Sequence, residues 1–174
     1  MASLEIIVVL LLVLLNGFLA MSELAIVSSR PARLEILVQK RVHGARRALV
    51  LASDHGKFLS TVQIGITLVG VLSGAFSGAT LGQRLAAWFA ELGLSQSAAD
   101  ILGVGLVVTL ITYATLIVGE LVPKQVALRN PERIAVKVAP AMDWLARISL
   151  PLVVLLDLSG KLMLALLGRG RSAG

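Results

Sequence analysis

The stretch TYATLIVGELVPKQVALRNPE, residues 112–132, places a carboxylate, a glycine and a proline within a long apolar segment. Pro123 has no backbone N–H, so in a helix the carbonyl oxygen of Gly119 loses its usual donor four residues on. The carboxylate of Glu120 follows directly after that carbonyl. Broken helices occur at membrane depth where they line a cavity or bind an ion. The stretch therefore predicts a break in a membrane-spanning helix, with two oxygen donors beside it.

A cation at this break would compensate both the free carbonyl of Gly119 and the carboxylate of Glu120. Carbonyl, hydroxyl and carboxylate oxygens are the ligands of hard cations such as Mg²⁺. Lys124 offers an alternative, because it lies four residues after Glu120 and can pair with it on one helix face. Two interpretations therefore stay open here, an ion site and a proline kink with a local salt bridge.

The composition extends the membrane interpretation to the whole chain of 174 residues. Hydrophobic residues make up 57%, charged residues 15%, and the mean hydropathy is +0.91. Soluble domains contain about 45–50% apolar and about 25% charged residues. The difference excludes an ordinary cytosolic enzyme, a disordered tail and a nucleic-acid-binding domain. Cysteine is absent, which excludes disulfides, thiolate metal sites and cysteine nucleophiles. We find no nucleophile–base pair at membrane depth, so we do not expect an enzyme.

Three apolar blocks are long enough to cross a bilayer, for which a helix needs about 20 residues. They cover residues 4–27, 58–87 and 101–122. A cleaved signal peptide is an alternative for the first block, but the basic segment that would precede it is missing. The predicted fold is an all-α integral membrane domain with three transmembrane helices.

The charges predict the orientation of these helices. Residues 28–57 are rich in Lys and Arg, whereas residues 88–100 contain neither. Basic loops stay on the cytosolic side, so a multi-pass protein of the cell (plasma) membrane is expected, with its N-terminus outside and residues 28–57 and the C-terminus cytosolic. Apolar residues recur within 28–57 at nearly helical spacing. We expect an amphipathic helix or a broken helical hairpin there, or a basic loop that contacts lipid phosphates.

A fourth apolar stretch, residues 148–167, is ambiguous. Asp157 and Lys161 lie four residues apart near its middle and can pair. If the stretch spanned the bilayer, Arg169 and Arg171 would lie outside, against the charge rule. We therefore favour an interfacial or partly inserted helix. The chain ends in a linker-like sequence, GRGRSAG, which suggests that a soluble domain follows.

Polar residues also occur inside the first two spans, where they cost free energy and suggest function. Asn16 and Glu23 share a face of the first span, with Ser22 beside them. The alternative is that such groups only hydrogen-bond between helices, and that Glu23 already lies at the interface.

The second span carries a stripe at three- and four-residue steps. Its inner half is polar and its outer half is lined by glycine. The polar half suggests a lined cavity. The glycines suggest a close-packing face, within the protomer or at a dimer interface. The alternative is that the whole stripe is a tight helix–helix contact, in which serine and threonine only hydrogen-bond between the helices. The stripe consists of Ser60, Gln63, Thr67, Gly70, Gly74, Gly78 and Gly82.

Three motifs together resemble the transmembrane domain of the CorC/CNNM (cyclin M) family. They are NGFLAMSELAIVSSR (residues 16–30), LSTVQIGITLVGVLSGAFSG (59–78) and GELVPKQVALRNPE (119–132). The resemblance covers nearly the whole chain, in order. It implies a homodimer in which each subunit has three transmembrane helices and a belt-like juxtamembrane helix, here about residues 131–167. It also implies Mg²⁺ transport, usually export, with Na⁺ coupling proposed for some members. Nucleotide would bind only to a cytosolic CBS-domain pair that lies outside this chain.

The resemblance also implies an ion site at Ser22, Ser60, Gly119 and Glu120. Pro123 would free the Gly119 carbonyl, and Lys124 would reach the lipid phosphates. Some relatives carry an asparagine in the second span after the glycine that matches Gly65, where the nearby positions of this chain are Ile66 and Gly70. The missing amide ligand would be replaced by Gln63, Thr67, Ser73 or water. Two rival functions are a membrane-anchored Mg²⁺-sensing or scaffold protein without transport, and Na⁺ or proton coupling centred on Glu120.

Overall fold

The computed structural model describes residues 2–168, and every regular element in this range is helical. Short breaks separate six continuous helical segments, two of which contain a π-helical turn, η. The elements are α1 (Ala2–Ser28), α2 (Pro31–Gln39), α3 (Ala45–Ser53), α4 (His55–Ser77), η1 (Gly78–Gly82), α5 (Gln83–Glu91), α6 (Gln96–Leu116), η2 (Ile117–Leu121), α7 (Val122–Arg129), α8 (Pro131–Ile148) and α9 (Leu150–Gly168).

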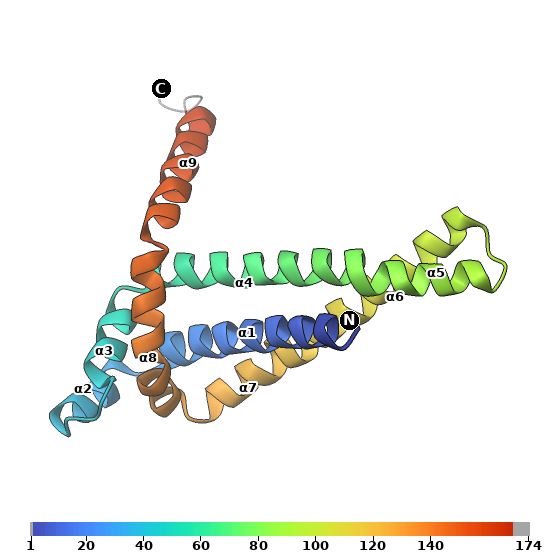
Figure 1. Ribbon diagram of the computed structural model, residues 1–174. Helices are drawn as coiled ribbons and strands as arrows, with labels where there is room; N and C mark the ends of the chain where they lie inside the picture. Colours follow the sequence, from blue (N-terminus) through green and yellow to red (C-terminus); the bar gives the residue numbers. More distant parts are fainter. Residues whose placement is uncertain (1, 169–174) are drawn as a thin grey trace.

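Four helical segments are long and apolar enough to cross a membrane by length and composition, so this is a multi-pass membrane protein. They are Ser3–Ser28, Phe58–Glu91, Gln96–Arg129 and Pro131–Ala165. The first three contain the predicted spans and extend beyond them. α1 and α4 lie side by side, and the α6–η2–α7 segment crosses them (Figure 1).

The predicted loop 88–100 is much shorter in the structure. α5 continues to Glu91 and α6 begins at Gln96, so only residues 92–95 connect them. Gly93 turns the chain with φ +97°, which glycine adopts without a Cβ clash. Trp88–Glu91 are compatible with a helix and simply continue it, while the side of the membrane on which this connection lies stays a prediction.

The basic segment folds as two short helices, α2 and α3, which pack on each other and, through α3, on α8. These elements gather at the C-terminal end of α1, and the α5–α6 hairpin lies at the opposite end (Figure 1). The main hydrophobic core is at this base of α2, α3 and α8, where the end of α1 and the start of α4 join it. Its fully buried side chains include Ile26, Leu34, Phe58 and Val62.

The glycine stripe of the second span packs only in part. A Cβ at Gly82 would lie 3.0 Å from the Cα of Val104, and Gly78 also faces α6. Among the described residues, no group outside their own helical turn lies within 4 Å of a Cβ position at Gly70 or Gly74. Within the protomer, the predicted close-packing face is therefore confined to η1.

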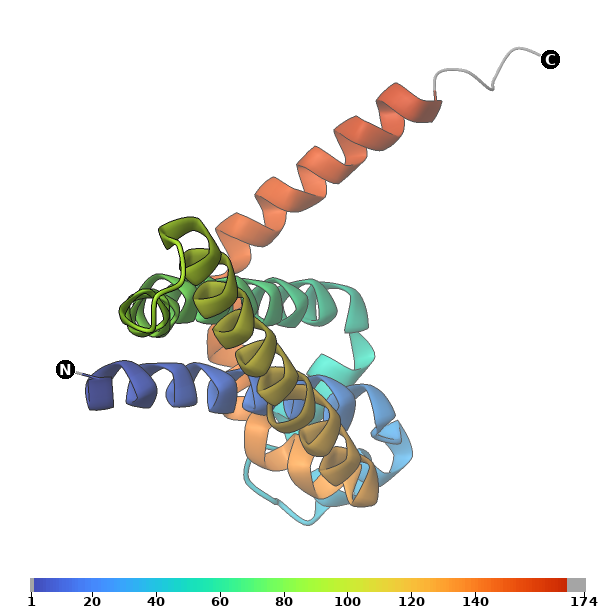
Figure 2. The same ribbon diagram turned by 90° about the vertical axis from the view of Figure 1, so that its right-hand side faces the viewer.

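α8 and α9 join at Ser149, and α9 projects away from the other helices (Figures 1 and 2). Figure 1 shows both helices at a steep angle to α1 and α4. Asp157 and Lys161 form the ion pair that their spacing allows, with 2.7 Å between Oδ2 and Nζ.

Candidate cation site

The break predicted at Pro123 is a π-helical turn, η2, that includes both Gly119 and Glu120. Its central feature is a hydrogen bond between helices. Asn16 of α1 donates from Nδ2 to the carbonyl oxygen of Gly119 over 3.0 Å. Asn16 is only 3% exposed. The carbonyl that lacks a donor because of Pro123 therefore finds one on the first span.

Two glycines allow this close approach. A Cβ at Gly17 would lie 3.0 Å from Pro123 Cγ and 3.1 Å from the Val118 carbonyl oxygen. A Cβ at Gly119 would lie 3.1 Å from the Val13 carbonyl oxygen. Contacts of this kind are tighter than ordinary packing, so both positions require glycine for the backbones to meet.

The amide oxygen of Asn16 is a second polar atom at this junction. Oδ1 is buried and has no hydrogen-bond partner among the described residues. A buried acceptor without a donor costs about 1–3 kcal/mol, so such atoms in native proteins call for an explanation such as a bound water or ion. Asn16 thus supplies a donor to Gly119 and an unused oxygen beside it.

Glu120 forms the salt bridge that was the alternative interpretation. Its Oε1 lies 2.8 Å from Lys124 Nζ, and the side chains are 37% and 32% exposed, respectively. The carboxylate is therefore half-buried and uses one oxygen for Lys124. The Glu120–Lys124 salt bridge and the Gly119 carbonyl, which accepts from Asn16 and not from Pro123, therefore lie side by side.

Ser22 lies on α1 and is fully buried. Its hydroxyl donates to the Phe18 carbonyl oxygen over 2.6 Å, so the proton is used within its own helix. A hydroxyl that donates keeps its oxygen lone pairs free to accept or to bind a cation. Ser22 therefore remains an oxygen donor.

The polar residues of the second span face different surroundings. Gln63 and Thr67 are exposed on α4. Ser73 is buried, and its Oγ has no hydrogen-bond partner among the described residues.

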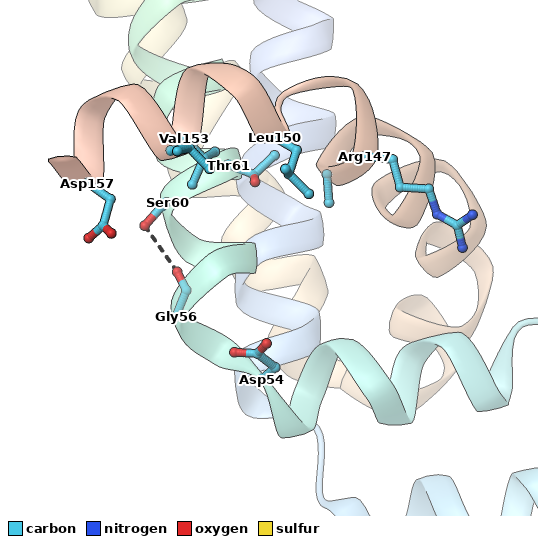
Figure 3. Close-up of a pocket in the computed structure, with 10 residues that line it drawn as sticks. Asp54, Gly56, Ser60, Thr61, Arg147, Leu150, Val153 and Asp157 are labelled. Carbon is cyan, nitrogen blue, oxygen red and sulfur yellow. Dashed lines mark hydrogen bonds between the residues drawn. The ribbon is translucent and has the colours of Figure 1, made fainter.

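Ser60 is exposed and donates to the Gly56 carbonyl oxygen over 3.1 Å. It lines a cavity of about 580 Å³ between the start of α4 and the end of α8 with α9 (Figure 3). Asp54 and Asp157 line this cavity, but Ser22, Gly119 and Glu120 do not.

The structure therefore joins some of the predicted site residues and not others. Gly119 meets Asn16, and Glu120 meets Lys124, both at η2. Ser60 belongs to the separate cavity of Figure 3. Among residues 2–168, no group of three or more His, Cys, Asp and Glu side chains is placed to hold a metal ion. Any cation at η2 would accordingly be bound mainly by neutral oxygens and one carboxylate.

Asn16 is the residue whose role the sequence did not predict. Its position inside an apolar span marked it as unusual, but nothing in the pattern indicated that its partner is the Gly119 carbonyl. The signal available was complementarity, because Pro123 removes one donor from the third span and Asn16 adds one to the first.

Comparisons with known proteins agree with this arrangement of motifs. Residues 6–174 match the cyclin M transmembrane N-terminal domain family. A UPF0053 protein of Synechocystis is 48% identical over 166 residues, which are 95% of this chain and 37% of the relative. The UPF0053 protein YhdP of Bacillus subtilis is 28% identical over 91% of this chain and 36% of its own length. The polyamine export protein of Escherichia coli is 28% identical over 86% of this chain and 33% of its own length. The chain thus spans little more than a third of these relatives.

Proposed function

Because the chain belongs to the cyclin M transmembrane domain family, we propose that it is the membrane part of a Mg²⁺ transporter. In this proposal the protein exports Mg²⁺ by alternating access around η2, with Na⁺ as the candidate coupling ion. Nucleotide would act only through a cytosolic region outside this chain. The membrane helices supply the ion path.

The observation that carries this proposal is the junction of Asn16 with Gly119. It combines a π-turn, a backbone carbonyl without its normal helical donor, and a buried amide oxygen without a partner. π-Turns inside α-helices are frequent at functional sites. Hard cations favour carbonyl, amide and carboxylate oxygens. A cation at this junction would satisfy Oδ1 of Asn16 and use the second lone pair of the Gly119 carbonyl.

Glu120 would give the site its negative charge. Its present partner is Lys124, so a divalent cation would compete with the ammonium group for the carboxylate. Ser22 would add a hydroxyl oxygen from α1, and Ser60 would act from its own cavity along the ion path. Release of Lys124 when the cation enters would couple binding to a change in charge at η2.

The remaining parts of the proposal concern assembly and orientation. α1, α4–α5 and α6–α7 would span the bilayer, with the N-terminus outside, and α8–α9 would lie along the cytosolic face as a belt. The open surfaces at Gly70 and Gly74 would face a second copy in a homodimer. Lipid would cover the remaining exposed apolar side chains of the spans.

The test is the thermal unfolding of the purified chain in detergent at increasing Mg²⁺, with Na⁺ and Ca²⁺ in parallel. A ligand that binds only the folded protein stabilises it by about 2.7 kcal/mol at a hundredfold excess over Kd. We expect Mg²⁺ to raise the Tm, and Glu120→Gln to abolish the rise. Asp143→Asn is the matched control, because Asp143 forms the same kind of i,i+4 pair with Arg147 on α8 and lines neither the Ser60 cavity nor η2.

The outcome separates the rival functions. If both variants keep the Mg²⁺ shift, Glu120 belongs to a helix kink and not to an ion site. If the shift depends on Glu120 but liposomes containing the protein carry no Mg²⁺ flux, the protein is a Mg²⁺ sensor or scaffold. A shift with Na⁺ or pH but not with Mg²⁺ would point to Na⁺ or proton coupling as the main event.

A second candidate cargo is an organic diamine, favoured by the cavity in Figure 3. One relative is named a polyamine export protein. The cavity combines two carboxylates, Asp54 and Asp157, with an apolar wall formed by Leu150, Val153 and Val154. Carboxylates joined by an apolar surface suit two ammonium groups on an aliphatic chain. Asp157 pairs with Lys161 over 2.7 Å, so a diamine would take the place of that ammonium group. The side chain of Arg147 pairs with Asp143 over 3.0 Å, which reduces its repulsion of such a cation.

The same unfolding assay distinguishes the two cargoes. For a diamine site we expect 1,4-diaminobutane to raise the Tm, and Asp54→Asn with Asp157→Asn to remove that rise. The Mg²⁺ shift at Glu120 would be unaffected. Equal stabilisation by 1-aminobutane would rule out recognition of two ammonium groups.

A further inference from the structure

A second cavity, of about 650 Å³, lies between α2, the turn after it and α8. It is lined by Leu37, Val42, His43, Arg133, Val136 and Lys137. Two of these side chains are cationic and one is an imidazole, and the other three are apolar. No carboxylate is among the lining residues. The cavity is thus a basic rim around an apolar floor.

The cationic groups of this cavity lack protein counter-charges. Arg133 and Lys137 lie four residues apart on α8, a spacing at which like charges repel. Within the described part of the chain, no salt bridge involves either of them, although Arg33, Arg47 and Arg147 all have acidic partners. Glu132, the nearest acidic residue in sequence, accepts the Arg30 backbone N–H and pairs with Arg33. Both side chains are exposed, so an anion from outside the protein could reach them.

The turn that presents His43 is held in a defined shape. The N–H of Val42 donates to the Leu37 carbonyl oxygen over 3.0 Å, and the N–H of Arg41 donates to the Val38 carbonyl oxygen over 2.9 Å. These are the two bonds of a Schellman motif. Its left-handed position, usually glycine, is occupied here by Arg41 with φ +55°. The chain accepts this backbone strain and closes the turn with Val42 and Leu37, which both line the cavity.

Gly44 fixes the turn against α8. It has φ +85°, and a Cβ at this position would collide with the Val136 carbonyl. The backbone after His43 therefore rests directly on the helix that carries Arg133 and Lys137. The three basic groups are presented from two elements that cannot separate without loss of this contact, so the cavity is preorganised.

We propose that this cavity binds a phosphate group, and specifically the headgroup of an anionic phospholipid. Guanidinium and ammonium groups are the main protein ligands of phosphate, and basic pockets beside membrane helices bind anionic lipid headgroups. The apolar floor of Leu37, Val42 and Val136 suits the start of an acyl chain. The cavity lies at the base of the spans, beside the end of α1. A free phosphate has the same anionic chemistry but does not use the apolar floor.

The experiment uses the whole chain in detergent micelles supplemented with lipid. Thermal unfolding and native mass spectrometry compare dioleoylphosphatidylglycerol with dioleoylphosphatidylcholine, and a third series contains inorganic phosphate. We expect the anionic lipid alone to raise the Tm and to remain bound. The double variant Arg133→Gln with Lys137→Gln should weaken lipid retention at least fivefold. The control, Lys40→Gln with Arg46→Gln, removes the same charge from exposed positions outside the cavity and should retain the lipid.

The other outcomes overturn the proposal. Equal losses in the two double variants would mean diffuse attraction between a basic surface and anionic lipid. A shift with inorganic phosphate that lipid does not exceed would assign the cavity to a soluble phosphate compound. The Tm in phosphatidylcholine checks that each variant is folded. The Mg²⁺ shift should remain in the Arg133→Gln, Lys137→Gln variant, so this proposal fails or succeeds independently of the ion site.

Discussion

The amide group of Asn16 has one atom that is paired and one that is not. Its nitrogen satisfies the Gly119 carbonyl, and its oxygen stays unpaired in a buried environment. An aliphatic residue of similar size would pack without the second cost but would leave the carbonyl without a donor. The choice of asparagine therefore relieves one unsatisfied group and creates another.

Replacement of Asn16 by Ala leaves the Gly119 carbonyl without this donor and a small cavity in its place, and it also removes the unpaired Oδ1. Because two of these three effects destabilise, we expect a net loss of about 1–3 kcal/mol. The measurement is thermal or denaturant unfolding in detergent. Leu15→Ala is the control, since Leu15 precedes Asn16 and is 46% exposed. A loss for Asn16→Ala no larger than that for Leu15→Ala would show that the hydrogen bond contributes nothing to stability.

The chemistry of single residues was partly predictable. Pro123 lacks an N–H by its covalent structure, so the loss of the α-helical donor to the Gly119 carbonyl follows from sequence alone. The pairing of Glu120 with Lys124 follows from helical spacing. The partner of Asn16 does not, because it depends on how two spans cross, which no local pattern records.

At the scale of the element, η2 and Pro123 depend on each other. Pro123→Ala restores a backbone donor four residues after Gly119, so this N–H could share that carbonyl with Asn16. We expect Asn16→Ala to cost less in the Pro123→Ala background than in the native chain, with a coupling of about 0.5–3 kcal/mol. Additive unfolding free energies in this double-mutant cycle would mean that the two residues act independently.

Two glycines of α6 provide a matched test of helix packing. A Cβ at Gly103 would collide with the backbone of Ala86 in α5. At Gly105, no group from another part of residues 2–168 lies within 4 Å of a Cβ position. Gly103→Ala should therefore destabilise by about 1–3 kcal/mol. Gly105→Ala should be neutral, or stabilising by up to about 1 kcal/mol because alanine favours helix. Unfolding in detergent measures both, and a large loss at Gly105 would reveal a contact with a second copy.

Within the protomer, the glycine stripe of the second span packs over a shorter length than its regular four-residue spacing suggested. Steps of four residues exceed the 3.6-residue turn, so each step advances by about 40° around an α-helix. Gly70 and Gly82 consequently point in different directions, and only the η1 end of the stripe meets α6. The element was predicted correctly as a long apolar helix; within the protomer only its η1 end packs closely, and a dimer contact along the rest of the stripe stays a prediction.

At the scale of the whole molecule, packing is concentrated at one end. The core joins α2, α3 and α8 to the spans, whereas the other end has an ion pair between Arg84 and Glu5, with 2.8 Å between Nη2 and Oε1. This pair ties α5 to α1. The helical class and the three apolar blocks followed from hydropathy. The packing of α2, α3 and α8 at the base did not follow from hydropathy, because it joins segments that are distant in the chain.

If transport needs the outer ends of α1 and α5 to separate, a covalent link between them should stop it. The chain has no cysteine, so Glu5→Cys with Arg84→Cys introduces a unique reactive pair. A thiol-cleavable bismaleimide should reduce Mg²⁺ flux in liposomes on the order of tenfold, and cleavage should restore it. Gln96→Cys with Asp100→Cys is the control, because those residues contact each other within α6. Undiminished flux in the linked protein would mean that this end does not open.

The two π-turns divide the second and third spans in a way that affects how the molecule bends. Sharp bends in long helices occur at π-turns and prolines, and η1 and η2 flank the α5–α6 hairpin on both sides. The hairpin therefore has a π-turn at each of its two attachments, where bending would be concentrated, while the base is held together by its core. A small tilt of α7 at the base would rotate the whole hairpin. The displacement would be greatest at the tip of the hairpin, which is too far from η2 for any side chain of η2 to contact.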